Sequence, residues 1–163
     1  MSTAPAPYAK PDIKVLLRAI AGDTTDSTLA SGITSSQWEV LSAYMQPMDI
    51  AAGRVLIAQG AEDRTLYFVE SGMLTVHFED VTGKIRLAAV GPGSVIGEGG
   101  FFSRMARSAT VQSSGACRLW TLGPMRFSEL ANRQPNVALA LAMALGAIMA
   151  RRLVSNRRRI AVT

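Results

Sequence analysis

Glycine is concentrated in one short segment that also carries a lone acid and two arginines. Five glycines fall within residues 91–100, Glu98 lies among them, and Arg104 and Arg107 follow. Glycines let backbone N–H groups approach an anion closely, and a short helical turn after Glu98 would aim further donors at the same point. Arg107 could then hold a phosphate through two parallel charge-assisted hydrogen bonds. The segment therefore predicts an anion-binding loop.

Two common phosphate-binding motifs do not fit this segment. A Walker loop requires a Gly-Lys-Ser/Thr sequence, which does not follow, and a dinucleotide fingerprint requires glycine at position 96, where the chain has Ile96. From composition alone, the alternative is an ordinary glycine-rich loop that ends at a surface arginine.

Metal and redox chemistry are restricted by the single cysteine, Cys117, and the single histidine, His77. One cysteine excludes an internal disulfide framework and a cysteine-based zinc site, and it suits a reducing compartment. One histidine cannot form the multi-histidine metal site of a cupin-type enzyme, so we expect His77 to be a surface residue. We therefore predict a cytoplasmic protein without a metal or a catalytic residue.

The elements that must position the glycine-rich segment read as short strands separated by glycines. Between Leu74 and Phe78, apolar and polar residues alternate, which predicts one buried and one exposed face, with His77 on the exposed one. Asp80 to Gly83 supply a hairpin turn. The predicted strands are 54–59, 65–70, 73–79, 84–90, 107–113 and 116–122. Many short strands with frequent turns indicate a β-barrel or jelly roll.

Helical patterns flank the strands on both sides. The N-terminal helical segment, residues 11–45, contains a helix around Leu16 and Ile20 and a second helix that begins at Ser35 or Ser36, with Trp38 and Leu41 facing inward. After the strands, one helix is predicted over Pro124–Asn132 and another from Pro135 to about Asn156.

The last helix is apolar around nearly its whole circumference. A surface helix of a monomer should show a polar stripe, so we predict that residues 137–153 pair with a second copy of the chain, with Leu145 or Ile148 as candidate outward positions. A fully buried core helix within one subunit is the alternative. The uninterrupted apolar stretch 137–150 is shorter than the about 20 residues of a membrane span, although an interfacial role with the arginine tail stays open.

Charge is distributed unevenly along the chain. The chain has 17 Lys and Arg against 12 Asp and Glu, a net charge of +5, and the five arginines at 151, 152 and 157–159 account for the whole excess. A neutral body argues against specific nucleic acid binding, which normally uses a basic face. Residues 1–10, rich in Ala and Pro, predict a disordered tail without a secretory signal, and 157–163 a basic tail.

One family resemblance connects these features. Gly97-Glu98, eight intervening residues and Arg107-Ser108-Ala109-Thr110 resemble the phosphate-binding cassette of cyclic nucleotide-binding domains, a family that includes the sensor domain of the catabolite activator protein. The resemblance extends over about 40–153, through Gln59-Gly60, Leu66-Tyr67-Phe68-Val69, Gly91-Pro92-Gly93 and Ala150-Arg151-Arg152-Leu153. It implies a mainly β fold with flanking helices: a double-stranded β-helix or jelly roll of eight strands, followed by C-terminal helices.

The resemblance also implies roles for individual residues. Arg107 would pair with the exocyclic oxygens of a cyclic phosphate and offset the repulsion between that phosphate and Glu98. Glu98 would accept a hydrogen bond from the ribose 2′-hydroxyl. Ser108, Gly97 and Gly99 would contact the phosphate, Leu87 would lie against the base, and Asn156 would contact the base from the last helix. Gly99 and Gly100 also predict a weakened cassette helix. We favour cyclic AMP as the ligand, with cyclic GMP as the alternative, and no further cofactor.

These expectations define a stand-alone cyclic nucleotide sensor that signals through its C-terminal helix to an unknown partner protein. The predicted units are a β-roll over 46–123 with the cassette at 97–110, and lid and dimer helices over 124–156. The alternative is the truncated sensor half of a transcription regulator, because too few residues follow Asn156 for a helix-turn-helix module.

Overall fold

The computed structural model describes residues 11–26, 28–29 and 32–161, with the side chains of Arg86 and of 156–161 excepted. The predicted tail 1–10 lies outside these ranges. Within them, eight strands form two antiparallel four-stranded sheets, ordered β1-β8-β3-β6 and β2-β7-β4-β5. The strands are β1 (Gln46–Ile50), β2 (Val55–Ile57), β3 (Leu66–Ser71), β4 (Leu74–Glu79), β5 (Ile85–Val90), β6 (Val95–Ile96), β7 (Thr110–Ser113) and β8 (Cys117–Leu122). The predicted mainly β fold is confirmed.

Strand β3 of the first sheet is buried on both faces and separates two hydrophobic cores. In β3, Leu66 and Phe68 pack toward the helices, whereas Tyr67 and Val69 pack into the interior of the roll. Strand side chains alternate between faces, so a strand covered on both sides must be apolar throughout. This explains the uninterrupted apolar sequence from 66 to 69.

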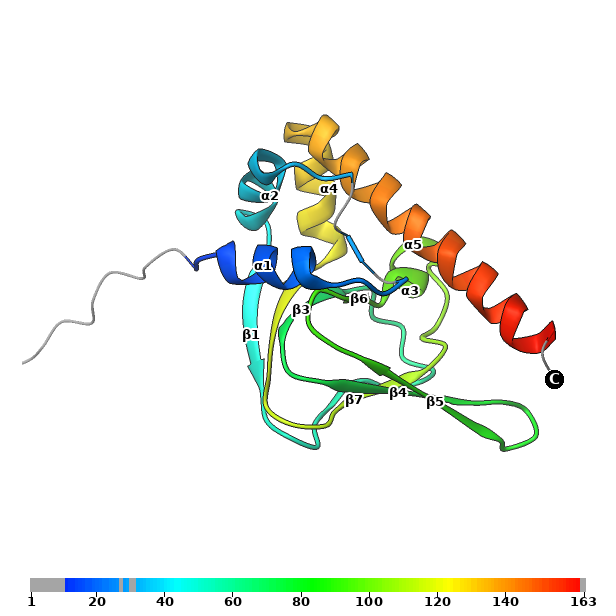
Figure 1. Cartoon of the computed structure of the whole chain (residues 1–163). Coiled ribbons are helices and arrows are strands. Elements are labelled where there is room, and N and C mark those ends of the chain that lie inside the picture. Colours follow the sequence, from blue (N-terminus) through cyan, green and yellow to red (C-terminus); the bar gives the residue numbers. More distant parts are fainter. Residues whose placement is uncertain (1–10, 27, 30–31, 162–163) are drawn as a thin grey trace, which may run out of the picture.

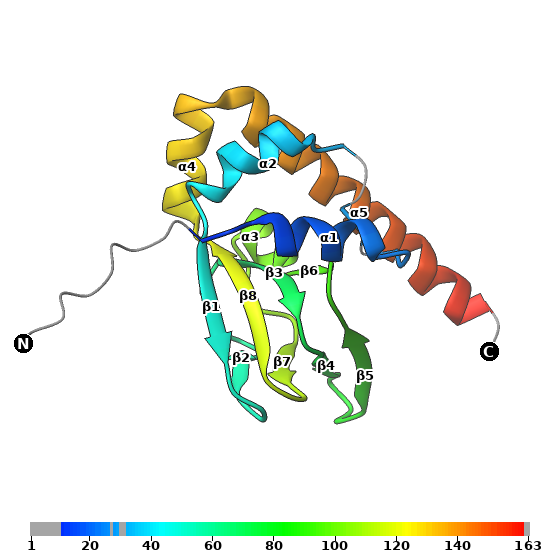
Figure 2. The same cartoon turned by 60° about the vertical axis from the view of Figure 1, so that its left-hand side comes forward.

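The helices gather at one end of the roll (Figures 1 and 2). Helix α1 (Lys14–Gly22) packs on β3, and α2 (Ser35–Ser42) begins with a capping box in which Thr34 accepts a bond from the Gln37 backbone. Trp38 of α2 is buried, as predicted, and meets Phe68 edge-on with ring centroids 5.8 Å apart. The N-terminal segment therefore closes the outer face of the first sheet.

Helices α4 (Pro124–Arg133) and α5 (Pro135–Ala161) complete the helical layer. The predicted outward positions Leu145 and Ile148 are wrong, because both side chains are completely buried in the core shared with the first sheet. The exposed apolar residues of α5 include Leu139 and Met143. The helix continues through the predicted basic tail to Ala161, and its C-terminal end lies on the β4–β5 side in both ribbon views (Figures 1 and 2).

Helix α5 also has the length and composition of a membrane-crossing helix. The stretch Pro135–Ser155 has 21 residues and a mean hydropathy of 1.8, and it includes Arg151 and Arg152 beyond the uninterrupted apolar residues 137–150. One such helix is weak evidence, since core helices of soluble proteins share these properties. Here Leu141, Leu145 and Ile148 pack fully buried against the domain core.

Candidate functional site

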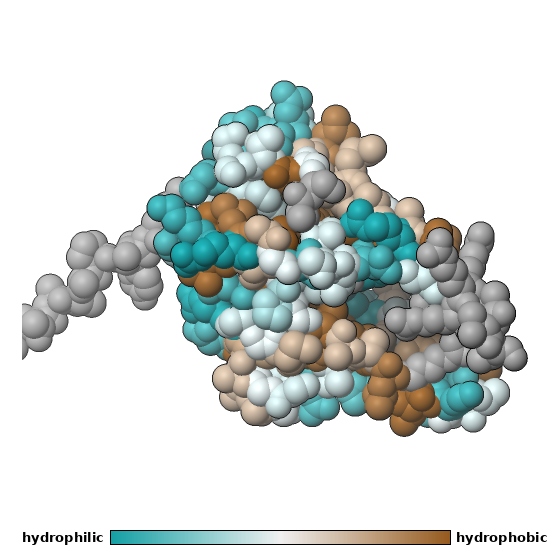
Figure 3. Space-filling view, in the orientation of Figure 1, coloured by the Kyte–Doolittle hydropathy of each residue, from teal (hydrophilic) through white to brown (hydrophobic). Residues whose placement is uncertain are grey.

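A pocket of about 640 Å³ opens between the β-roll, the glycine-rich segment and α5. Its floor is apolar and comes from Ile57, Val76 and Val111 of the second sheet together with Ile96. Its charged groups include Glu98, Arg107 and Arg152, and the space-filling view shows a recess beside the hydrophobic surface of the β4–β5 hairpin (Figure 3). This size and this mixture of an apolar floor with few polar groups are typical of small-ligand sites.

The glycine-rich segment folds into a single helical turn that borders the pocket. Helix α3 (Glu98–Ser103) begins after Gly97, which has a left-handed backbone with φ 89°. A Cβ atom at Gly97 would lie 2.7 Å from the Thr65 carbonyl oxygen and 2.8 Å from Arg107 Nη1, so only glycine fits. Burial of Phe101, which meets the Phe127 ring edge-on, anchors the turn despite the glycines that follow Glu98.

The first turn of α3 presents backbone donors to the pocket. The first N–H groups of a helix have no acceptor within the helix, and Gly99 and Gly100 both line the pocket. A Cβ at Gly99 would meet nothing within 4 Å. Backbone N–H groups in this position suit an anion.

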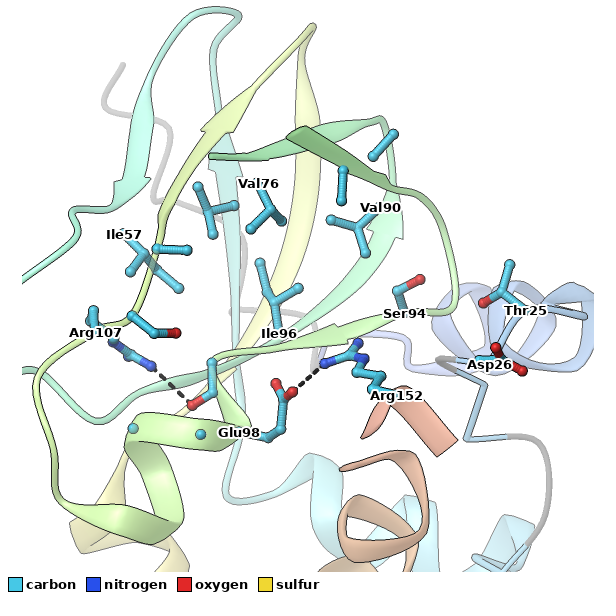
Figure 4. Close-up of a pocket in the computed structure, with 18 of the residues that line it drawn as sticks. Thr25, Asp26, Ile57, Val76, Val90, Ser94, Ile96, Glu98, Arg107 and Arg152 are labelled. Carbon is cyan, nitrogen blue, oxygen red and sulfur yellow. Dashed lines mark hydrogen bonds and ion pairs between the residues drawn. The ribbon is translucent and has the colours of Figure 1, made fainter. Parts of the chain in front are cut away.

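Arg107 is buried and its guanidinium is held by three groups. Its side chain is 3% exposed, and Nε and Nη2 donate to the Asp63 carboxylate at 3.1 and 2.5 Å. Nη1 donates to the Gly97 carbonyl at 2.9 Å (Figure 4). Nη2 also donates to the Thr65 carbonyl at 2.7 Å. The hydrogen bonds from Arg107 hold the pKa of the Asp63 carboxyl below its ordinary value.

This geometry corrects the predicted two-bond clamp of Arg107 on a phosphate. A guanidinium has five N–H donors, and the four hydrogen bonds leave one Nη1 donor for a ligand. The two parallel hydrogen bonds of the guanidinium, from Nε and Nη2, go to the Asp63 carboxylate instead. Arg107 therefore offers an anion its charge and a single, rigidly oriented N–H.

Glu98 is paired with Arg152 of α5, not with Arg107. Arg152 Nη1 donates to Glu98 Oε1 (Figure 4). Arg152 Nη2 donates to the Val95 carbonyl at 2.7 Å. The two side chains are 27% and 14% exposed. The cation that neutralises Glu98 directly is therefore supplied by the last helix.

A cation and an acid thus line one pocket next to backbone donors at the start of α3. The model of the cyclic nucleotide-binding domain family matches residues 47–134, more than half of the chain. The chain belongs to the cyclic nucleotide-binding domain family.

Curated relatives and solved structures agree with this family. Over 104 residues the chain is 36% identical to glutaminase 2 of Bradyrhizobium diazoefficiens. The matched region covers 64% of this chain and 16% of that protein. Over 111 residues it is 32% identical to the cAMP-activated global transcriptional regulator CRP of Haemophilus influenzae. This match covers 67% of this chain and 48% of that protein. The chain therefore spans about half or less of these two relatives.

The fold resembles the crystal structure of a cyclic nucleotide-binding domain from Methylobacillus flagellatus. The TM-score is 0.79 at 20% identity, and the match covers 91% of this chain and 82% of that one. At this identity the likeness concerns the fold alone. The eight strands match the β-roll of the family, and the last helices match the C-terminal helices that follow it.

The structure brings most of the predicted site residues together. Gly97, Glu98, Gly99, Arg107 and Ser108 all line the pocket. These five residues come from the two ends of the predicted cassette 97–110, so both ends of the cassette border one cavity.

Neither of the two predicted base contacts, Leu87 and Asn156, is confirmed by the lining of the pocket. Leu87 is 66% exposed and does not line the pocket, because it is paired with His77 on the outer face of the sheet. The neighbouring Ala88, opposite Val76, faces the pocket instead. The side chain of Asn156 lies outside the described part of the chain, whereas Ser155 lines the pocket.

Sequence reasoning missed Asp63 and the N-terminal contribution to the site. Asp63 lies 44 residues before Arg107, and nothing in the spacing links them. Thr25 and Asp26, in the loop between α1 and α2, also line the pocket. Among the residues described, no group of three or more His, Cys, Asp or Glu side chains is arranged to hold a metal ion.

Proposed function

We propose that this domain is a cyclic nucleotide sensor that binds a purine 3′,5′-cyclic monophosphate, cyclic AMP or cyclic GMP, and performs no chemistry on it. The observation that carries the proposal is the placement of Arg107 and Glu98 on one pocket of about 640 Å³, beside the backbone donors of α3. Arg107, Ser108 and the α3 backbone would bind the phosphate. Glu98 would accept the ribose 2′-hydroxyl through the oxygen that does not receive Arg152.

Titration calorimetry of the ligand-free protein with cyclic AMP and cyclic GMP tests this function. Arg107→Lys keeps the positive charge but loses the planar fork, so we expect binding to weaken about tenfold to a hundredfold. Arg126→Lys, at an exposed ion pair of α4, is the matched control and should bind as wild type does. Arg107→Lys with wild-type affinity, or a wild type that binds neither nucleotide, would contradict the proposal.

The output of the sensor would pass through α5. Residues 139, 143, 146, 150 and 153 are all exposed and follow one another at alternating spacings of four and three, the pattern of a coiled-coil seam. Gly146 has nothing within 4 Å of its Cβ position, which leaves room for close helix approach. This stripe supports a homodimer through 137–153. The proposal also places the sensor in the cytoplasm, where an unknown partner protein would bind the C-terminal end of α5.

The sensor half of a transcription regulator is a second candidate. It is favoured by the 32% identity to the Haemophilus influenzae regulator, of which the chain spans 48%. A protein containing this domain would then bind particular DNA sequences more tightly when cyclic nucleotide is present. The arginine-rich end alone predicts weak, salt-sensitive binding that does not depend on sequence.

A further inference from the structure

The loop between α1 and α2 supplies a carboxylate to the pocket. Thr25 and Asp26 line the cavity together with the cassette. Figure 4 shows them on the side opposite Arg107, with the Glu98–Arg152 pair in between. The site therefore has two ends, one cationic at Arg107 and one acidic at Asp26.

Contacts with α5 hold Asp26 in place. Ser155 Oγ donates to Asp26 Oδ2, and Arg151 Nε donates to the Asp26 carbonyl at 3.2 Å. Arg151 Nη2 also donates to the Thr28 carbonyl at 2.7 Å, and Thr28 forms a β-bridge with Ser94 beside the pocket. The acidic end is thus fixed between the last helix and the strand that leads into the cassette.

The order of groups in the ligand determines which part meets Asp26. This step rests on the proposed function, in which the phosphate lies at Arg107 and the ribose at Glu98. The base follows the ribose and extends away from the phosphate, so it must occupy the end that Ser94, Asp26 and Ser155 line. Asp26 is then a residue that reads the base.

The hydrogen-bonding edges of the two purines differ at this point. An ionised carboxylate can only accept hydrogen bonds. Guanine offers two adjacent donors, the N1–H and the 2-amino group, which match the two oxygens of one carboxylate. Adenine offers one donor, the 6-amino group, next to the N1 lone pair, which a carboxylate repels. We propose that Asp26 accepts hydrogen bonds from the guanine edge and makes this site selective for cyclic GMP over cyclic AMP.

This assignment reverses the sequence-based preference for cyclic AMP. The ligand is a monoanion, so a carboxylate at the far end of the pocket disfavours every cyclic nucleotide by the same amount. Two charge-assisted hydrogen bonds from guanine offset that cost, and the single one from adenine does so less well. The preference therefore depends on the base and not on the phosphate.

Calorimetric titration of the full chain with cyclic GMP, cyclic AMP and cyclic IMP tests the assignment. Wild type should bind cyclic GMP about tenfold or more tightly than cyclic AMP. Cyclic IMP, which keeps N1–H but lacks the 2-amino group, should fall between them. Asp26→Asn presents one acceptor and one donor, the complement of adenine, so the preference should shrink to near unity or invert. Glu39→Gln, an exposed site on α2, is the charge-matched control and should keep the wild-type ratio.

The outcomes separate this inference from the function on which it rests. If Asp26→Asn weakens both nucleotides equally, Asp26 only supports Ser155 and the inference is overturned while the sensor function stands. A wild type that prefers cyclic AMP overturns the inference in the same way. If wild type binds none of the three nucleotides, the proposed function fails, and the inference fails with it.

Discussion

Arg152, in the C-terminal part of α5, donates a hydrogen bond to the carboxylate of Glu98, 54 residues earlier in the chain. The pair joins the cassette directly to the last helix, and the second bond from Arg152 to the Val95 carbonyl fixes the same guanidinium to β6. Because Arg152 uses Oε1, the second oxygen of Glu98 can accept a sugar hydroxyl. Under the proposed function, this acid would bind both the ligand and the last helix.

The first prediction concerns the sugar. If Glu98 accepts the 2′-hydroxyl, a 2′-deoxy cyclic nucleotide leaves a charged acceptor unpaired and should bind about tenfold more weakly than its ribose parent. Glu98→Gln should reduce this preference, measured by calorimetry with both ligands. Equal binding of the two ligands to wild type would show that Glu98 only positions Arg152.

Two glycines of the cassette make a matched pair. Gly97→Ala places a Cβ 2.7 Å from the Thr65 carbonyl in a left-handed backbone, so it should destabilise the fold by about 1–3 kcal/mol and weaken binding. Gly99→Ala meets nothing within 4 Å and lies in a helical turn, so stability should be unchanged or rise by up to about 1 kcal/mol. Urea unfolding compares the two, and similar losses in both variants would contradict this account of the turn.

The Arg107–Asp63 pair predicts how stability depends on pH. Hydrogen bonds from Arg107 lower the pKa of Asp63 in the folded chain, so the carboxylate favours folding above its unfolded pKa of about 4. That contribution is lost as the pH falls through the lower folded pKa. Wild type should therefore be more stable than Asp63→Asn near neutral pH. The difference between their free energies of unfolding should become smaller below a pH of about 4.

Urea unfolding of both proteins at a series of pH values measures this gap. Asp49→Asn is a control, because Asp49 pairs with Arg118 on the exposed side of the first sheet. A gap between wild type and Asp63→Asn that stays constant into strong acid would show that the pair does not shift the titration of Asp63.

The exposed stripe on α5 makes oligomeric state testable. Leu139 and Met143 are 61% and 69% exposed, and Arg at either position would bury an unpaired charge in the proposed seam. We expect wild type to scatter light as a dimer and both variants as monomers. Met125→Arg, on α4 and 85% exposed, is the control and should stay dimeric. A wild type that is monomeric at the highest attainable concentration would contradict the seam.

The sequence was sufficient where the pattern is local. Alternation predicted the β4–β5 hairpin, and helical spacing placed Trp38 and Leu41 inward. The resemblance to the family cassette predicted that Glu98 and Arg107 share one site, and both line the pocket. Strands β1 and β6 were outside the predicted runs. Strand β1 contains Pro47 and Asp49 and lacks a clean alternation, and β6 has only two residues. Short or irregular strands are defined by their neighbours in the sheet.

The missed parts of the site depend on contacts between distant segments. Asp63 meets Arg107 across 44 residues, and Ser155 meets Asp26 across 129. No periodicity encodes such pairs, because the tertiary fold alone brings them together. Leu87 shows the same limit within one strand, since a residue next to the pocket lining turns away from it when the register assigns it to the other face.

The last prediction concerns how ligand binding reaches α5. Bound nucleotide should slow amide exchange at residues 97–108 of the cassette and also at 150–157, because Glu98 would connect the ligand to Arg152. Arg152→Gln removes the ion pair while leaving Arg107, Asp63 and the α3 backbone intact. In this variant the cassette should still be protected by ligand, whereas the protection at 150–157 should largely disappear.

Arg133→Gln, an exposed arginine of α4 that pairs with Glu129, is the control and should behave as wild type. Protection confined to the cassette in wild type would show that the domain holds nucleotide without transmitting the event along this route. A ligand can shift the position of α5 only by binding one arrangement more tightly than another, and the Glu98–Arg152 pair gives it the contact to do so.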